Sequence, residues 1–264
     1  MCRKLFFSYI CLVHMILYYS GCGNSRWVAE MLADSLRETL LFIPDSEPEL
    51  TLRAGEALGF VFPVYSWAPP HLVLDFIRRI NLSNRPAYVW FACTCGDEGD
   101  YTRQVFCRAL RKTGLSLDAC FCLQMPETYL AFPGFSLDTP ENVQRKIEAA
   151  RADLPRISDL LAKRTRNHYE MLRGAFPLTK TYLLRPLFYR FIISDRQFHA
   201  TDACIGCGQC AQNCPVHNIR LINGRPVWQG HCVHCMGCYH HCPTNAVQYG
   251  KLTQGKGQYH GVDA

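Results

Sequence analysis

Two cysteine runs dominate the second half of the chain: CIGCGQCAQNCP spans residues 204–215, and CVHCMGCYHHCP spans residues 232–243. Both runs have the spacing C-x2-C-x2-C-x3-C-P. This spacing places three thiolates on one tight loop, and the fourth follows after a short helical turn that directs it away from its own loop. The proline after the last cysteine stops further helix. Zinc sites instead pair two ligands with two others across a longer loop.

The spacing therefore predicts two [4Fe–4S] clusters, each bound by three cysteines of one run and the fourth cysteine of the other. The expected ligands are Cys204, Cys207, Cys210 and Cys242 for cluster 1, and Cys214, Cys232, Cys235 and Cys238 for cluster 2. Residues 200–250 resemble the bacterial two-cluster ferredoxins. Because cysteines supply every ligand, we expect the nearby histidines at the surface, namely His217, His231, His234, His240 and His241.

Composition describes a globular protein with an uneven charge. The chain has 264 residues, of which 48% are hydrophobic and 19% charged, so an intrinsically disordered chain is excluded. The net charge is +6, and residues 161–264 hold 12 Lys and Arg against 4 Asp and Glu. A basic half raises the hypothesis of nucleic-acid binding. Clusters with four thiolates are anionic and would offset part of this charge, which weakens that hypothesis.

The first half alternates apolar strand-like segments with amphipathic helix-like segments. The pattern predicts strands at 15–19, 40–43, 57–64, 87–93 and 119–125, and helices at 26–40, 71–80, 101–112 and 140–162. Strands that are each followed by a helix form a parallel sheet with helices on both faces. Right-handed crossovers make that five-stranded α/β sheet doubly wound.

A glycine-containing loop, Ser20-Gly21-Cys22-Gly23-Asn24-Ser25, joins the first strand to the first helix. Backbone N–H groups and hydroxyls at a helix N-terminus form an anion cradle. No Gly-Lys-Ser/Thr follows, so the loop is not a Walker A motif. It resembles the flavodoxin fingerprint Ser/Thr-x-Thr-Gly-x-Thr, in which Ser20, Gly23 and Ser25 match. The resemblance implies a bound FMN, although Cys22 replaces the usual threonine and removes one hydroxyl donor.

Two further loops follow strands at the edge where flavodoxin-like folds hold the flavin ring. From these loops we expect contacts by Tyr65, Ser66, Trp67, Thr94, Cys95, Gly96 and Tyr101, with Trp67, Tyr65 and Tyr101 as ring-stacking candidates. Cys22 and Cys95 are candidate redox thiols beside the flavin. The cysteines at 93, 107, 120 and 122 are expected as small buried apolar residues.

The patterns divide the chain into a flavodoxin-like domain at 15–165, a connector at 166–199, a two-cluster ferredoxin-type domain at 200–250, and a loose tail at 251–264. Residues 1–14 are interpreted as an N-terminal extension. The alternative is a signal peptide or membrane anchor, because Leu5 to Ser25 carries no charge. Cleavage before Cys22 would remove the first strand, and no twin-arginine signal is present, so we expect a cytoplasmic protein.

As a whole, residues 15–250 resemble the fusion family in which a flavodoxin-like domain precedes a two-cluster ferredoxin domain. The resemblance implies electron relay between the clusters and FMN, with a redox protein or a small molecule as partner. No general acid, base or nucleophile constellation stands out, so a carrier is preferred to an enzyme with its own substrate. One alternative is a ferredoxin-type carrier or docking module on an empty flavodoxin-like scaffold. The least favoured is a redox-sensing nucleic-acid binder.

Overall fold

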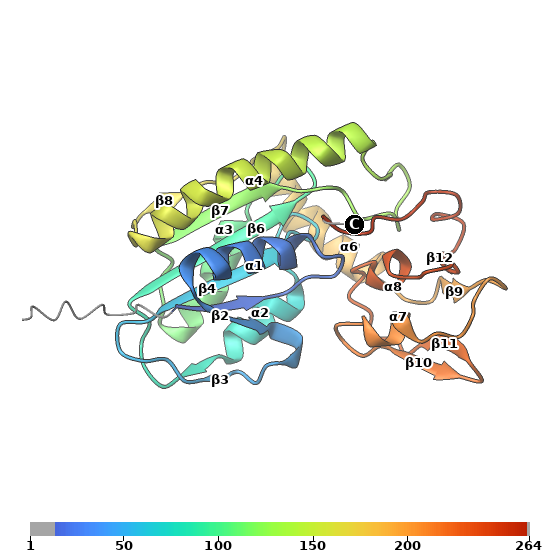
Figure 1. The fold of residues 1–264 in the computed structure, drawn as a ribbon, viewed down its shortest axis with the longest axis horizontal. Coiled ribbons are helices and arrows are strands. Elements are labelled where there is room, and N and C mark those ends of the chain that lie inside the picture. Colours follow the sequence, from blue (N-terminus) through green and yellow to red (C-terminus); the bar gives the residue numbers. More distant parts are fainter. Residues whose placement is uncertain (1–13, 263–264) are drawn as a thin grey trace, which may run out of the picture.

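The computed structural model describes residues 14–262, in which an α/β domain packs against a smaller domain that contains the cysteine runs (Figure 1). The interpreted extension lies almost wholly outside the described residues. The strands of the first domain are β1 (His14–Tyr18), β2 (Thr39–Phe42), β3 (Glu49–Leu50), β4 (Ala57–Pro63), β5 (Asn81–Leu82), β6 (Tyr88–Cys95), β7 (Ala119–Gln124) and β8 (His168–Tyr169). Its helices are α1 (Asn24–Leu36), α2 (His71–Arg79), α3 (Thr102–Leu110) and α4 (Pro140–Ala162), with 3-10 turns η1 (Ile43–Asp45) and η2 (Arg111–Thr113).

The main sheet has six parallel strands in the order β2-β1-β4-β6-β7-β8. Its first five strands follow the order of a flavodoxin-like doubly wound sheet, which confirms the predicted fold class. The sixth strand was not predicted, because two residues are too few to form an alternating pattern. It extends the sheet through a bond from the Glu170 N–H to the Cys120 carbonyl at 2.8 Å. Strands β3 and β5 form a separate parallel pair.

Two apolar layers hold this domain together, one on each face of the sheet. Trp90 and Phe121 belong to the layer with α1 and α4, and Phe91 and Phe106 belong to the layer with α2 and α3. Strands β4 and β6 are almost entirely apolar because both of their faces are covered. The helix on each face brings the strand-to-helix loops to one edge, the carboxyl edge of the sheet.

The residues at which helices begin and end are explained by local backbone conformation and by side-chain hydrogen bonds. Helix α1 ends at Leu36 because Arg37 adopts a left-handed conformation with φ 57°. Helix α4 covers the predicted range and begins after Thr139, whose hydroxyl accepts a bond from the Asn142 N–H. Among the described residues, no helix combines the length and apolarity needed to cross a bilayer.

The second domain is built from short elements around the two cysteine runs. Strand β9 (Phe198–Ala200) pairs with β12 (Val247–Tyr249), and β10 (Ile219–Ile222) pairs with β11 (Arg225–Trp228), both antiparallel. Each run contains one helical turn, α7 (Gln209–Gln212) or α8 (Gly237–His240). The two turns pack on each other, so the runs meet at the centre of the domain.

Two further segments belong to the folded structure. The connector contains a continuous helix formed by α5 (Pro177–Thr179), a π-helical turn η3 (Lys180–Leu184) and α6 (Arg185–Phe191). The segment after residue 250, expected to be loose, packs against both domains as far as it is described. The Tyr259 hydroxyl donates to Asn24 Oδ1 at 2.7 Å, and Lys256 Nζ donates to the Phe135 carbonyl at 2.6 Å. These bonds join residues that are distant in sequence, and no local sequence pattern predicts them.

A carboxylate beyond the C-terminus of α1 weakens the fold at neutral pH. Burial, followed by the nearby Glu56 carboxylate, raises the pKa of Glu38 to about 8. Because this pKa exceeds that of the unfolded chain, Glu38 costs stability as the pH rises from about 4.5 to about 8. We expect Glu38→Gln to raise the Tm by about 2–4 °C at pH 8 and by little at pH 4, measured by circular dichroism. Glu47→Gln, at an exposed position, is the control, and an equal gain at both pH values would contradict the prediction.

Candidate functional site

The four cysteines expected at cluster 1 line one small cavity in the second domain. Cys204, Cys207 and Cys210 come from the first run and Cys242 from the second. Cys207 is exposed, and Cys210 and Cys242 are buried. The structure thus brings the fourth cysteine of one run to the first three of the other.

The four cysteines expected at cluster 2 form a second, more enclosed group. Burial and the neighbouring Cys235 and Cys232 thiols raise the pKa of Cys238 well above its ordinary value. Cys214 also lies near Cys238. Thiolates gathered this closely repel one another without a cation, and iron relieves the repulsion because metal binding deprotonates thiols and stabilises the thiolates. The donor set therefore fits an iron–sulfur cluster.

Backbone N–H groups point at several of these sulfurs. Cys242 Sγ accepts from the Ala246 N–H and Cys214 Sγ from the Asn218 N–H, both at 3.2 Å. The two bonds occupy equivalent positions in the two runs, four residues after each last cysteine. Such bonds stabilise negative charge on cluster sulfur and raise a cluster's potential.

The spacing of the thiols differs from that of a single-ion site. Within residues 14–262, no three His, Cys, Asp or Glu side chains lie close enough to hold one metal ion. A [4Fe–4S] cluster is larger than one ion and takes one cysteine on each iron.

Two histidines expected at the surface are buried where the domains meet. His240 Nε2 donates to the Thr128 carbonyl at 2.7 Å, and His240 Nδ1 accepts from the Tyr259 N–H at 3.0 Å. His234 Nδ1 accepts from the Tyr129 hydroxyl at 3.0 Å. Burial lowers the pKa of both histidines, that of His240 to about 4. Through these hydrogen bonds, the two neutral rings hold the second domain against the loop that follows β7.

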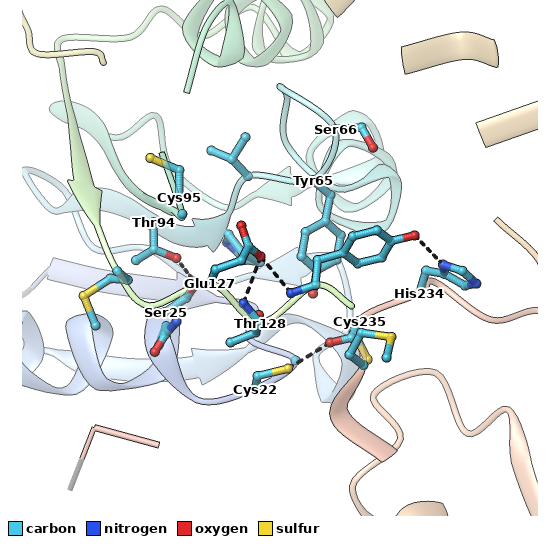
Figure 2. A pocket seen from close by; sticks show the side chains of 18 of the residues that line it. Cys22, Ser25, Tyr65, Ser66, Thr94, Cys95, Glu127, Thr128, His234 and Cys235 are labelled. Atoms are coloured by element: carbon cyan, nitrogen blue, oxygen red, sulfur yellow. Dashed lines mark hydrogen bonds between the residues drawn. The ribbon is translucent and has the colours of Figure 1, made fainter. Parts of the chain in front are cut away.

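A cavity of about 480 Å³ lies at the carboxyl edge of the sheet, between the two domains (Figure 2). This volume is in the usual range for a small-molecule site. Its walls include most of the predicted flavin contacts, namely Ser20, Gly21, Cys22, Asn24, Ser25, Tyr65, Ser66, Trp67, Thr94, Cys95 and Gly96. Three loops that are distant in sequence meet here because the strands before them are parallel neighbours.

The loop before α1 has the geometry of an anion cradle. Helix α1 begins at Asn24, and its N-terminus has no side-chain cap and no acidic residue in the first turn. The first N–H groups of the helix and its dipole thus favour an anionic group at this wall of the cavity. Gly23 adopts φ 100°, which requires glycine, and is not among the lining residues. The hydroxyls of Ser25 and Thr94 are 2.8 Å apart and hold the loop against β6.

The loop after β4 is strained at its tip. Ser66 and Trp67 have positive φ of 49° and 61°, a conformation that costs energy for residues other than glycine. Such strain clusters at ligand sites, and Trp67 lines the cavity. Tyr101, predicted as a further stacking residue, lies outside the lining. Its ring packs beside Tyr182, with the Arg173 guanidinium 5.2 Å from its centre. Tyr101 lies outside the cavity because it immediately precedes α3, on the side of the sheet where the connector helix packs.

The sequence patterns missed Glu127, which stands on the loop after β7. Its Oε1 accepts from the Thr128 and Tyr129 N–H groups at 2.8 and 2.7 Å (Figure 2). Its Oε2 lies against Gly96. Burial raises the pKa of this carboxyl group. A single Glu in a loop carries no motif. The available signal was its position after a fifth strand, at the edge where the other loops were expected.

The cluster 2 loop touches the loop before α1 directly. Cys22 Sγ donates to the Cys235 carbonyl at 2.9 Å (Figure 2). A Cβ on Gly21 would lie 2.5 Å from Cys235 Cβ, and a Cβ on Gly237 would lie 2.6 Å from the Gly21 carbonyl oxygen. Only glycine at both positions permits this approach. The contact places a predicted cluster ligand at the wall of the cavity.

The second candidate redox thiol, Cys95, has a sulfur neighbour. Cys95 Sγ is 3.5 Å from Cys122 Sγ, on the adjacent strand β7. Cys93 lies on the same face of β6, two residues earlier, opposite Cys122. The Cys22 thiol is occupied by the bond to Cys235. The predicted burial agrees with the structure for Cys93 and Cys120, whereas Cys107 and Cys122 are only partly buried.

Comparison with known proteins gives one family match and several structural similarities. Residues 192–247 match the family of 4Fe-4S dicluster domains. A comparison with curated proteins found no match to the chain. Solved structures similar to it include a flavodoxin of Streptococcus pneumoniae TIGR4 (16% identity, TM-score 0.34, 55% of this chain and 99% of the flavodoxin). Another is a putative flavoprotein of Bacteroides uniformis (14% identity, TM-score 0.36, 51% of this chain and 97% of that one). A third is an FMN-dependent NADH-azoreductase of Bacillus anthracis in complex with FMN (9% identity, TM-score 0.35, 55% and 99%).

The sheet order and the matched segment define the class of protein. The chain joins a flavodoxin-like α/β domain to an iron–sulfur domain of the dicluster type. Both domain types are typical of electron-transfer proteins.

Proposed function

We propose that this protein relays electrons between two [4Fe–4S] clusters and one FMN. When bound, the clusters supply one-electron transfer and the flavin supplies one- or two-electron chemistry. The observation that carries the proposal is the contact between the Cys235 carbonyl and the Cys22 thiol at 2.9 Å. It joins the cluster 2 loop to the anion cradle, so the two cofactor sites share a wall.

Each wall of the cavity has a distinct task in this proposal. The open N-terminus of α1 binds the phosphate. Trp67 and Tyr65 hold the ring, and the apolar side chains of Phe132 and Phe188 exclude water from the cavity. Glu127, whose pKa is raised by burial, holds or releases a proton at Oε2 when the charge in the cavity changes. Cysteines Cys204, Cys207, Cys210 and Cys242 hold the outer cluster, and Cys214, Cys232, Cys235 and Cys238 hold the cluster beside the cavity.

Anaerobic purification, followed by an absorbance spectrum and quantification of iron, sulfide and FMN, tests this proposal. We expect about eight iron atoms and one FMN per chain. About eight irons without flavin, even after FMN is added, would contradict the relay. Zinc in place of iron, after expression with adequate iron, would contradict both cluster assignments.

One structural feature favours the alternative of a ferredoxin-type carrier on a flavin-free scaffold. The Glu127 carboxyl group stands in the same cavity as the anion cradle, and an ionised carboxylate there repels a phosphate. The raised pKa of Glu127 reduces this repulsion. The relay and the flavin-free carrier differ in their response to pH, because only the relay includes FMN binding. FMN binding is expected to weaken as the pH rises and Glu127 becomes ionised.

Cys22 offers a direct test of the cradle. We expect Cys22→Thr to tighten FMN binding by up to about tenfold, because it restores a hydroxyl donor, and one hydrogen bond contributes about 0.5–1.5 kcal/mol. Quenching of FMN fluorescence on titration measures the change. Cys107→Thr, a substitution of a thiol on α3, is the matched control. Unchanged affinity for Cys22→Thr would show that the new hydroxyl keeps the Cys235 carbonyl as its acceptor, as the thiol does, and does not bind the phosphate.

A further inference from the structure

The connector helix presents apolar side chains to solvent. Phe176 is 79% exposed, Phe191 71% and Leu183 57%, with Leu178, Leu184 and Leu187 also exposed. Leu183, Leu187 and Phe191 recur four positions apart, which places them on one face. An exposed apolar stripe of this kind marks an interaction surface.

The opposite face of the same helix is fully engaged. Thr181 Oγ1 donates to the Trp67 carbonyl at 3.2 Å, and Arg185 Nη2 donates to the Pro69 carbonyl at 3.0 Å. The Tyr189 ring stacks on His71, and Phe188 lines the cavity. The helix is therefore fixed in place by its inner face, and neither the core nor the cavity accounts for its outer face.

The charges around the outer face of this helix indicate which kind of surface it can bind. Residues 171–194 contain Arg173, Lys180, Arg185 and Arg190 and no Asp or Glu. Lys180 pairs with Glu98, and Arg185 is partly buried, which leaves Arg173 and Arg190 exposed at the two ends of the apolar stripe. A second copy of this chain would bring the same positive charges to the same face and be repelled. An anionic surface is attracted.

We propose that this helix lies on an anionic lipid surface, with Phe176, Leu183 and Phe191 at the headgroup–acyl boundary. A helix with Phe and Leu on one side and Lys or Arg beside them, fixed parallel to the surface, is typical of interfacial membrane binding. Arg190, and Arg173 from its position over the Tyr101 ring, then contact lipid phosphates, and each such residue adds electrostatic attraction. Because Phe188 lines the cavity from this helix, the cavity lies next to the bilayer.

Flotation of the full-length protein with lipid vesicles tests the proposal. The probes are vesicles of phosphatidylcholine alone and vesicles that also contain phosphatidylglycerol. We expect binding to the anionic vesicles, at least about tenfold weaker binding to the neutral ones, and loss of binding at high salt. No binding to the anionic vesicles, or equal binding to both, would overturn the proposal.

A pair of variants assigns the binding to this helix. We expect Leu183→Glu with Leu187→Glu to lower the vesicle partition coefficient by about tenfold or more. Ile222→Glu with Val227→Glu makes the same change at exposed positions of the β10–β11 hairpin and is expected to leave binding within about twofold. All four side chains are exposed, and unchanged circular dichroism verifies folding. Undiminished binding of the Leu183 and Leu187 variant would assign vesicle binding to another segment and overturn the proposal. The proposal would also be overturned if the unaltered protein associates with itself and this variant does not.

Discussion

The Cys207→Ala protein is expected to contain about four iron atoms per chain, against about eight expected for the unaltered protein. Cys207 is the exposed thiol of the cluster 1 cavity, so its removal takes one expected ligand from cluster 1 and leaves the cysteines expected at cluster 2 unchanged. A cubane that loses a cysteine ligand is destabilised, because each iron takes one thiolate. Iron and sulfide analysis after anaerobic purification measures the loss. Cys107→Ala, a cysteine of α3, is the control and is expected to keep about eight irons.

Double variants test how the two runs share their ligands. Cys207→Ala with Cys242→Ala removes two thiols from one cavity, so about four irons remain. Cys207→Ala with Cys214→Ala removes one thiol from each group, although both residues belong to the same sequence run, and most of the iron is lost. The opposite pattern would show that each run binds its own cluster. Because metal binding and folding are coupled in small domains, circular dichroism of the α/β domain verifies that the remainder is folded.

Gly21→Val is expected to separate the two domains at the shared wall. A Cβ at position 21 would lie 2.5 Å from Cys235 Cβ and 2.9 Å from the Cys235 carbonyl oxygen. The second of these is a backbone atom of the cluster 2 loop, so the loop itself must move. Overpacking of this kind costs about 1–3 kcal/mol of unfolding free energy. In the proposed relay, displacement of the loop is also expected to slow reduction of the flavin through the clusters by about tenfold or more.

Thermal unfolding and stopped-flow reduction of the flavin measure the two effects. Ala175→Val makes a similar enlargement at an exposed position and is expected to change neither quantity. Gly237→Ala is the reciprocal test, since its Cβ would lie 2.6 Å from the Gly21 carbonyl oxygen. Full-rate flavin reduction in both glycine variants would show that electrons do not cross this contact.

Strongly periodic or spaced patterns were sufficient for several features. The alternation of apolar strands with amphipathic helices predicted the doubly wound sheet, because parallel strands buried on both faces must be apolar throughout. The helix at Pro140–Ala162 agreed with its prediction. The cysteine spacing predicted which thiols meet, and the structure gathers Cys242 with the first run and Cys214 with the second.

Features without a local pattern were decided only by the tertiary structure. Strand β8 is two residues long, and Tyr101 is separated from the cavity only because of where α3 begins. Glu127 and His234 reach the cavity through contacts between distant segments, which periodicity does not encode. The segment around Tyr259 packs through a hydrogen bond to Asn24, which is 235 positions away.

The sequence by itself determined the class of each domain, because spacing and periodicity are local properties of the chain. Only the tertiary structure decided that the cluster 2 loop rests on the anion cradle and that the connector helix covers the cavity with its apolar face outward. The physical reason is that the packing of one domain on another depends on surface shape. Gly21 and Gly237 permit this close approach, and its geometry exists only once both domains are folded.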